Sequence, residues 1–320
     1  MHTTYSNPQS PEPNTQMKPN KYYLSAFTAF VIWGFFSLAL KPLHDYPSLD
    51  ILFYRVFYAT VLLLVINLFF RKEAVKSDWN SLKSMTKKQR LKVILLTVTG
   101  GFLLIVNWYL FIFAMNHISL KSASFAYLIC PILTTILAYL ILKEKLSKWQ
   151  WFAVSLSLIS CLILSFGDLT ELIYSLIIAL TFAFYLITQR KNNQFDRFVI
   201  LTVQLVIAAI IILPFFPKYS GDVPQESLFY ILLTFIVVLF TIIPLFLNLY
   251  ALKGMNSSAV GILMYVNPLI NFLLAVLYFK EEIDLIQIIS YSLILISVVV
   301  FNEKIVFGKK PLDCARGDKS

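Results

Sequence analysis

Ten long apolar runs, separated by polar or charged residues, constrain the fold of this chain more than any other feature. Each run is close to the roughly 20 residues that an α-helix needs to cross about 30 Å of hydrocarbon. The runs cover residues 22–41, 49–70, 93–115, 118–142, 149–167, 171–189, 197–216, 227–249, 257–279 and 284–303. Only 14% of the residues are charged, whereas a soluble domain carries about 25%. The sequence therefore predicts an all-α integral membrane protein with ten transmembrane helices.

The basic residues gather on one side of these predicted helices. If the N-terminus is cytoplasmic, 22 of the 27 Lys and Arg residues fall in cytoplasmic segments, eight of them between 71 and 92. The outer side keeps only Lys41, Lys121, Lys218 and Lys280. The positive-inside rule then predicts a protein of the bacterial cytoplasmic (inner) membrane with both termini in the cytoplasm. The net charge of +10 reflects topology, and no nucleic-acid partner is expected.

The two ends of the chain and the cysteines carry little further information. Residues 1–20 are polar and proline-rich ahead of any apolar run, which predicts a disordered cytoplasmic tail rather than a signal peptide. Residues 306–320 form a second cytoplasmic tail. Cys130, Cys161 and Cys314 are too few and too scattered for a disulfide framework, so we expect free thiols.

An internal repeat divides the chain. The stretch from Ala114 to Gln150 realigns without a gap on Ala251 to Gln287, at a constant offset of 137, and this places Pro131 on Pro268. A weaker match at an offset of 150 relates the first predicted helix to the sixth, with Ser25 on Ser175 and Ala29 on Ala179. We therefore expect a first unit over residues 21–167 and a second over 168–305.

Five helices per unit is an odd number, so the second unit must enter the membrane from the opposite side. Inverted repeats of this kind are a recurring plan of secondary transporters, in which two near-equivalent halves expose a midplane site alternately to each side. Duplication without any transport activity stays the alternative.

Particular segments in both halves carry a family resemblance. They are Ala29–Gly34, Tyr54–Arg55, Asn107–Trp108 with Ala114, the run around Tyr127 and Pro131, Glu144, Gln150–Trp151, Tyr265, Pro268, Asn271–Val276 and Glu281. Over roughly residues 20–305 the chain resembles the drug/metabolite transporter (DMT) superfamily, in particular EamA-domain carriers of the RarD type. The resemblance implies a ten-helix fold with a central cavity lined by both halves, and movement of small organic molecules. The segment Phe152–Ser155 lacks the glycine that many EamA domains have after the residue equivalent to Gln150.

Arg55 is the only charged residue well inside a predicted helix, where an ionisable group costs roughly 2.5–3.5 kcal/mol to insert. Its planar guanidinium suits a carboxylate or phosphate, and Tyr58 lies three residues on, on the same helical face. We therefore predict that Arg55 faces the cavity and binds an anionic group of the substrate. Alternatively, Arg55 lies about 9 Å below the outer boundary and snorkels or pairs with a carbonyl.

The proline-containing helices supply a second group of cavity candidates. Asn267 and Asn271 flank Pro268, and Tyr127 precedes Pro131 by four residues on the equivalent helix. A proline frees a backbone carbonyl that needs a partner, so both helices are expected to kink beside a cavity. In the alternative interpretation the kinks only serve packing, with the Asn side chains bonded between helices.

Further polar or aromatic side chains inside the predicted helices complete the substrate-binding candidates. These are Trp33, Asn107, Trp108, Gln204, Asn248 and Tyr265. Each could equally well be a packing residue, and the abundance of aromatic residues does not establish an aromatic substrate, because many belong to interfacial belts.

The acidic residues lie outside the predicted membrane core. Glu144 and Glu281 occupy equivalent positions at helix exits, where we expect them to end the helix and hold a loop, with gating as the alternative. No Asp or Glu lies deep in a predicted helix, so coupling through a buried carboxylate is not expected.

Other classes of function fit poorly. His2, His44 and His117 are too dispersed for catalysis or a metal site, and no phosphate-binding glycine loop is present. We thus expect no enzyme activity, no metal, no cofactor and no use of ATP. The sequence favours a carrier of small metabolites, such as amino acids or related carboxylates, over a channel or a ligand sensor without flux. It leaves open whether the protein is a monomer or a homodimer.

Overall fold

The computed structural model describes residues 21–43, 45–117, 120–164, 169–278, 280 and 285–303, which are mostly helical. The helices of the first half are α1 (Lys21–Gly34), α2 (Phe36–Leu40), η1 (Lys41–Leu43), α3 (Ser48–Val65), η2 (Ile66–Phe70), α4 (Lys72–Ser84), α5 (Lys87–His117), α6 (Leu120–Leu142) and α7 (Lys148–Leu164). Those of the second half are α8 (Leu169–Lys191), α9 (Arg197–Ile212), η3 (Leu213–Phe215), α10 (Phe216–Tyr219), α11 (Ser227–Val237), η4 (Val238–Ile242), α12 (Ile243–Gly254), α13 (Ser257–Leu263), α14 (Val266–Leu277) and α15 (Leu285–Phe301). The predicted tails, Glu281 and Cys314 lie outside the described residues.

The ten predicted transmembrane runs all correspond to helical segments of the described chain. Six segments are long and apolar enough to cross a membrane, namely Leu49–Phe70, Lys87–Ala114, Ile173–Lys191, Arg197–Tyr219, Ser227–Gly254 and Ser257–Leu274. Three shorter apolar helices cover Ala126–Leu142, Lys148–Leu164 and Leu285–Phe301. The first run folds as α1 and α2, which are separated at Phe35. Helices satisfy their backbone hydrogen bonds internally, which hydrocarbon requires of any spanning segment. The expected all-α membrane fold is confirmed.

The distribution of polarity matches a lipid environment. Large apolar side chains lie on the outside, as shown by Phe70 at 81% exposure and Leu277 at 74%, whereas Gln189, Gln204 and Asn248 are fully buried. In a soluble protein such an apolar surface would be an aggregation liability. Here it faces lipid, and the polar side chains are collected between the helices.

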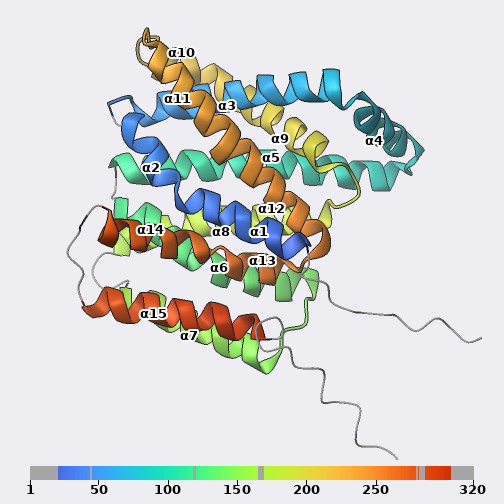
Figure 1. Ribbon diagram of the computed structural model, residues 1–320. Coiled ribbons are helices and arrows are strands. Elements are labelled where there is room, and N and C mark those ends of the chain that lie inside the picture. The colour runs from blue at the N-terminus through green and yellow to red at the C-terminus, as the bar shows by residue number, and fades with distance from the viewer. Residues whose placement is uncertain are drawn as a thin grey trace, which may run out of the picture.

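The two halves interleave rather than sit side by side (Figure 1). Helix α8, which opens the second half, packs against α5 and α6 of the first. Helix α1, which opens the first half, packs against α12 and α14 of the second. The last helices of the two halves, α7 and α15, pack together at one edge of the bundle (Figure 1). Each half thus makes the same contacts to the other, as an inverted repeat requires.

The repeat extends to the backbone at the helix exits. Lys143, after α6, and Lys280, after α14, are the positions that the offset of 137 equates, and both adopt left-handed backbone angles, with φ of 58° and 54°. Such angles are uncommon for residues other than glycine, although they are typical of the residue that follows a helix. After α6 the Glu144 N–H closes the turn by donating to Ala138 O at 3.2 Å.

Glu144 also holds the start of a helix in the other half. Its carboxylate accepts hydrogen bonds from Ser257 N at 2.7 Å, Ser258 N at 3.1 Å and Ser258 Oγ at 2.6 Å, all at the N-terminus of α13. A carboxylate there satisfies orphan amide groups and complements the helix dipole. The expected loop-holding role of Glu144 is therefore visible as a cap that joins the two repeats.

The two repeat prolines have different effects. Pro131 lies inside the continuous helix α6, and its own carbonyl accepts the Thr135 hydroxyl at 2.9 Å. Pro268 is the third residue of α14, so its missing N–H falls in a first helical turn, where it would be unpaired anyway. The break in this segment instead precedes it, at Met264 and Tyr265 between α13 and α14. In place of the expected kink, the helical segment of the second repeat is interrupted before Pro268, whereas that of the first repeat continues through Pro131.

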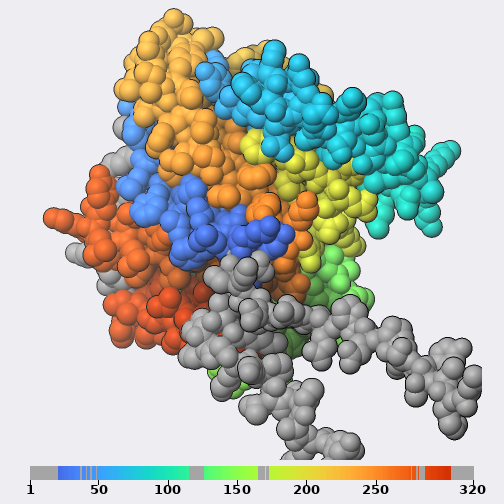
Figure 2. Space-filling model, turned by 45° about the vertical axis from the view of Figure 1, so that its right-hand side comes forward, coloured from blue at the N-terminus to red at the C-terminus, as the bar shows by residue number. Residues whose placement is uncertain are grey.

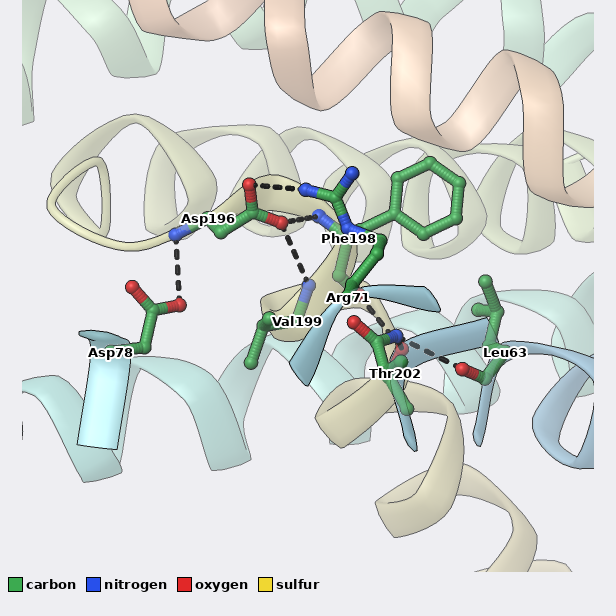
Figure 3. A network of polar contacts seen from close by, with 8 residues as sticks. Leu63, Arg71, Asp78, Asp196, Phe198, Val199 and Thr202 are labelled. Atoms are coloured by element: carbon green, nitrogen blue, oxygen red, sulfur yellow. Dashed lines mark hydrogen bonds and ion pairs between the residues drawn. The ribbon is translucent and has the colours of Figure 1, made fainter. Parts of the chain in front are cut away.

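Polar contacts tie the ends of several helices together (Figure 3). The Arg71 guanidinium lies 2.7 Å from Oδ2 of Asp196, whose Oδ1 caps α9 by accepting from Phe198 N and Val199 N. The Asp196 N–H in turn donates to Oδ2 of Asp78 on α4 at 3.0 Å. Helix α4 lies in the basic segment between the second and third apolar runs, and this segment projects at one side of the molecule (Figure 2). The contact between Asp196 and Asp78 joins α4 to the start of α9.

Candidate functional site

Arg55 lies on α3 among residues of three other segments. Its Nε donates to the Thr241 hydroxyl of η4 at 2.7 Å. The guanidinium carbon lies 4.3 Å from the centre of the Trp108 ring on α5 and 5.2 Å from that of Phe36 on α2. These cation–π distances are within the range at which an aromatic face attracts a cation. Sequence-distant helices thus converge on one positive charge.

The charge of Arg55 has no acidic partner in the part of the chain that the structure describes. No carboxylate lies within ion-pair distance of it, and its two terminal nitrogens make no hydrogen bond to the described residues. The side chain is nevertheless only half-buried, so it keeps accessible surface between the helices. Two parallel N–H groups of a guanidinium match the two oxygens of a carboxylate. The site can therefore accept an oxyanion.

The π-helix η4 is the part of the site that the sequence reasoning missed. Pro244 lacks an N–H, so the Phe240 carbonyl, four residues earlier, loses its normal helical donor. The Trp33 indole of α1 donates to this carbonyl at 3.0 Å instead. Thr241 in turn donates to Ile236 O at 3.2 Å while accepting from Arg55. π-Helical turns often occur at functional sites, and Pro244 is the signal that could have revealed this one.

Tyr127 brings the proline-containing helix α6 to the same region. Its ring lies 5.4 Å from that of Phe111, between α6 and α5. Its phenol also lies within electrostatic range of the Arg55 guanidinium. Of the predicted candidates, the structure thus gathers Arg55, Trp108, Tyr127 and Trp33, and it adds the unpredicted Thr241.

Other predicted candidates lie away from Arg55 or already have partners. Tyr58 is 44% exposed and lies outside this cluster. Asn107 joins α5 to α8, because its Nδ2 donates to Ile178 O at 2.9 Å and to the Thr181 hydroxyl at 3.0 Å. Such bonds between helices give Asn107 a clear packing role.

The candidates on α13 and α14 form a separate group. Asn271 Nδ2 donates to Asn267 Oδ1 at 2.7 Å, so these two amides bond to one another across one helical turn. Tyr265 is fully buried at the break before α14. The remaining candidates, Gln204 on α9 and Asn248 on α12, are fully buried further along the bundle.

The described residues offer little other chemistry. They contain no group of three His, Cys, Asp or Glu side chains that could hold a metal ion. Cys130 and Cys161 are buried free thiols in the described core.

Comparison with known proteins gives a consistent result. The model of the EamA-like transporter family matches residues 20–166 and again residues 169–302. The uncharacterized transporter YojE of Bacillus subtilis is 30% identical over 279 residues, which cover 85% of this chain and 90% of YojE. The protein RarD of Escherichia coli is 27% identical over 287 residues, which cover 87% of this chain and 92% of RarD.

A solved crystal structure shares the fold. It superimposes with a TM-score of 0.69 over 87% of this chain and 95% of its own, at 15% identity. The double family match, the apolar helical segments and the interleaved packing agree on a multi-pass membrane transporter rather than an enzyme. The chain belongs to the EamA-like transporter family.

Proposed function

We propose that this protein is a secondary carrier that moves small organic metabolites, amino acids or related carboxylates, by alternating access and without ATP. The observation that carries the proposal is Arg55, a cation within a membrane-spanning helix whose two terminal nitrogens are unpaired among the described residues. A cation with unused donors is costly within a membrane-spanning helix, even when it is only half-buried. Binding of a substrate carboxylate would satisfy it.

The packing of the halves supports an alternating mechanism. Arg55 and Trp33 both contact η4, a segment of the opposite repeat, through Thr241 and Phe240. A substrate that binds Arg55 therefore acts directly on the junction between the two repeats. Inverted repeats exchange conformations around a shared site, and a π-helical turn can absorb the backbone change that such an exchange requires.

The proposal includes an orientation. The distribution of Lys and Arg residues favours an inner-membrane protein with cytoplasmic termini. Export is the working direction. Reporter fusions at Gly221, in the segment between α10 and α11, and at Lys145, between α6 and α7, test the topology, because the first should report the outer side and the second the cytoplasm.

Counterflow in proteoliposomes tests the carrier. Vesicles loaded with unlabelled L-amino acids or monocarboxylates should accumulate the labelled compound, and Arg55→Gln should abolish this exchange. Arg55→Lys should retain only part of it, because an ammonium lacks the planar fork. Arg90→Gln is the matched control, since Arg90 is exposed and donates to carbonyls of α4.

The same measurement separates the alternatives. A ligand sensor would bind substrate without any flux, and a channel would show flux without stimulation by substrate on the opposite side. Wild-type exchange in both Arg55 variants, at matched protein amounts, would reject the binding role of Arg55.

A further inference from the structure

The inverted repeat gives Arg55 a counterpart in the second half. Helices α3 and α9 are equivalent, and aligning their first residues, Ser48 and Arg197, sets an offset of 149. This alignment places Arg55 on Gln204, and four residues later Ala59 on Ala208. Position 204 therefore holds an amide where the first half holds a guanidinium.

The surroundings are repeated as well. Arg55 contacts α2, in the first transmembrane segment, through Phe36, and it contacts η4, in the eighth, through Thr241. Under the repeat, the first transmembrane segment corresponds to the sixth, which contains α8. The eighth segment likewise corresponds to the third, which contains α5. Gln204 lies against these two helices, next to Gln189 of α8 and Gly100 of α5.

Gly100 is where the two amides converge. A Cβ atom added at this glycine would lie 2.4 Å from Gln204 Nε2 and 2.5 Å from Gln189 Nε2, so any other residue would displace both side chains. The absent side chain leaves room for the amide groups between α5, α8 and α9. The sequence did not indicate this arrangement, because Gln189 marks the predicted end of a helix there.

These amides lack partners among the described residues. Both the nitrogen and the oxygen of Gln189 and of Gln204 are buried without a hydrogen bond, and the same holds for the Asn248 amide on α12. Helix α12 packs against both α8 and α9. The Tyr185 hydroxyl, one turn before Gln189, is also buried and unpaired within this part of the chain. Buried polar atoms without partners are costly in an apolar medium. A polar molecule bound among these side chains would supply the missing hydrogen bonds.

The position of the group relates it to the Arg55 site. Helices α3 and α9 run antiparallel, as the bonds from Thr60 to Leu205 O and from Asn67 to Thr202 show. Thr60 lies level with Leu205, the neighbour of Gln204. Because Arg55 precedes Thr60 by five residues at 1.5 Å per residue, Gln204 lies roughly 8 Å from Arg55 along the helix axis, on the cytoplasmic side.

We propose that Gln189 and Gln204, converging on Gly100, form a second, uncharged subsite that takes a small zwitterionic solute on the cytoplasmic side of Arg55. Amide nitrogens donate to a carboxylate and amide oxygens accept from an ammonium group, so the pair fits both ends of an amino acid. A neutral site holds a carboxylate less tightly than a guanidinium does. The solute therefore passes between a charged site and an uncharged one, and the uncharged site releases it.

This inference rests on the proposed carrier function, so its test must distinguish failure of the subsite from failure of the carrier function. In counterflow with radiolabelled L-amino acids, the double variant Gln189→Leu/Gln204→Leu should lose about tenfold in rate, and Gly100→Ala should lose a similar factor. The double variant Ser157→Ala/Ser297→Ala removes a buried polar pair between α7 and α15 and is the matched control. Wild-type rates in the Gln double variant, with Arg55→Gln inactive, would overturn the subsite and leave the carrier intact. Absence of exchange by the wild-type protein would contradict the carrier function itself.

A second measurement applies even if the double variant fails to fold. Gln204→Cys, in a background with Cys130, Cys161 and Cys314 changed to Ala, should react with a membrane-impermeant methanethiosulfonate added from the cytoplasmic side. L-Amino acids should slow this reaction severalfold. Complete absence of labelling, or labelling that amino acids do not slow, would overturn the subsite.

Discussion

The Trp33 indole N–H donates to the carbonyl oxygen of Phe240 across 207 positions of sequence, at 3.0 Å. This bond ties the first transmembrane segment to the π-helix η4 that also holds Arg55 through Thr241. The geometry of the candidate site therefore depends on a backbone carbonyl whose usual donor, four residues later, is replaced by Pro244.

Replacing Trp33 by Phe should destabilise the protein and slow counterflow. The variant keeps an aromatic ring but removes the donor, and a buried carbonyl left unpaired costs about 1–3 kcal/mol. Thermal unfolding in detergent measures the first effect and proteoliposome exchange the second. Trp79→Phe, on the exposed helix α4, should change neither. An unaltered melting temperature in Trp33→Phe would show that the bond is dispensable.

Replacing Pro244 by Ala should change the role of Trp33. Alanine restores an N–H that can donate to Phe240 O within the helix, so η4 should relax toward an ordinary α-helix. In this background Trp33→Phe should cost less stability than in the wild type, by about 1 kcal/mol of coupling. Additive effects of the two substitutions would contradict the causal link between the proline and the indole bond.

Replacing Glu144 by Ala should lower stability by about 2 kcal/mol, because three donors at the start of α13 lose a charged acceptor. Glu144→Gln should lose less, since its amide oxygen still accepts. Melting temperatures of both variants test this order. Glu73→Gln, at an exposed position of α4, is the control.

Replacing Asp78 by Asn should stabilise the protein near neutral pH. Burial raises the pKa of Asp78, and the hydrogen bond from the Asp196 N–H offsets this only in part. Because the pKa is raised, ionisation of Asp78 destabilises the fold above that pKa, and the cost vanishes as the pH falls below the ordinary value of 3.8. The advantage of the Asn variant should thus shrink as the pH falls through the raised pKa toward 3.8. Asp222→Asn, in an exposed segment, should show no such trend.

Replacing Asp196 by Ala should cost more than replacing Arg71 by Ala. Both changes break the partly exposed ion pair, which is worth at most about 1 kcal/mol. The Asp196 variant also loses the cap of α9, worth about 1 kcal/mol more. Equal shifts in melting temperature would contradict a capping contribution.

The sequence was informative where a local pattern decides the structure. Apolar length alone located the helical segments, and the offset of 137 that pairs Pro131 with Pro268 revealed the repeat. The cost of a charge in hydrocarbon singled out Arg55. None of these inferences needs knowledge of a distant contact.

The sequence was less informative where the role of a side chain depends on residues that are distant in the sequence. Thr241 escaped attention because its role depends on the freed carbonyl beside it and on an arginine 186 positions away. Tyr58 follows Arg55 by less than one helical turn, yet it is 44% exposed, because helical spacing does not say which neighbours flank the helix. Substrate contacts of all these residues stay predictions.

The interleaving of the halves also bears on the origin of the chain. Since α1 packs against α12 and α14, and α8 against α5 and α6, neither half completes its own core. The N-terminus of α13 is likewise capped by Glu144 from the other half. An ancestral five-helix protein of this design would have been complete only beside a copy inserted upside down. Such an ancestor would have needed to insert into the membrane in both orientations, a need that the two linked halves of this chain remove.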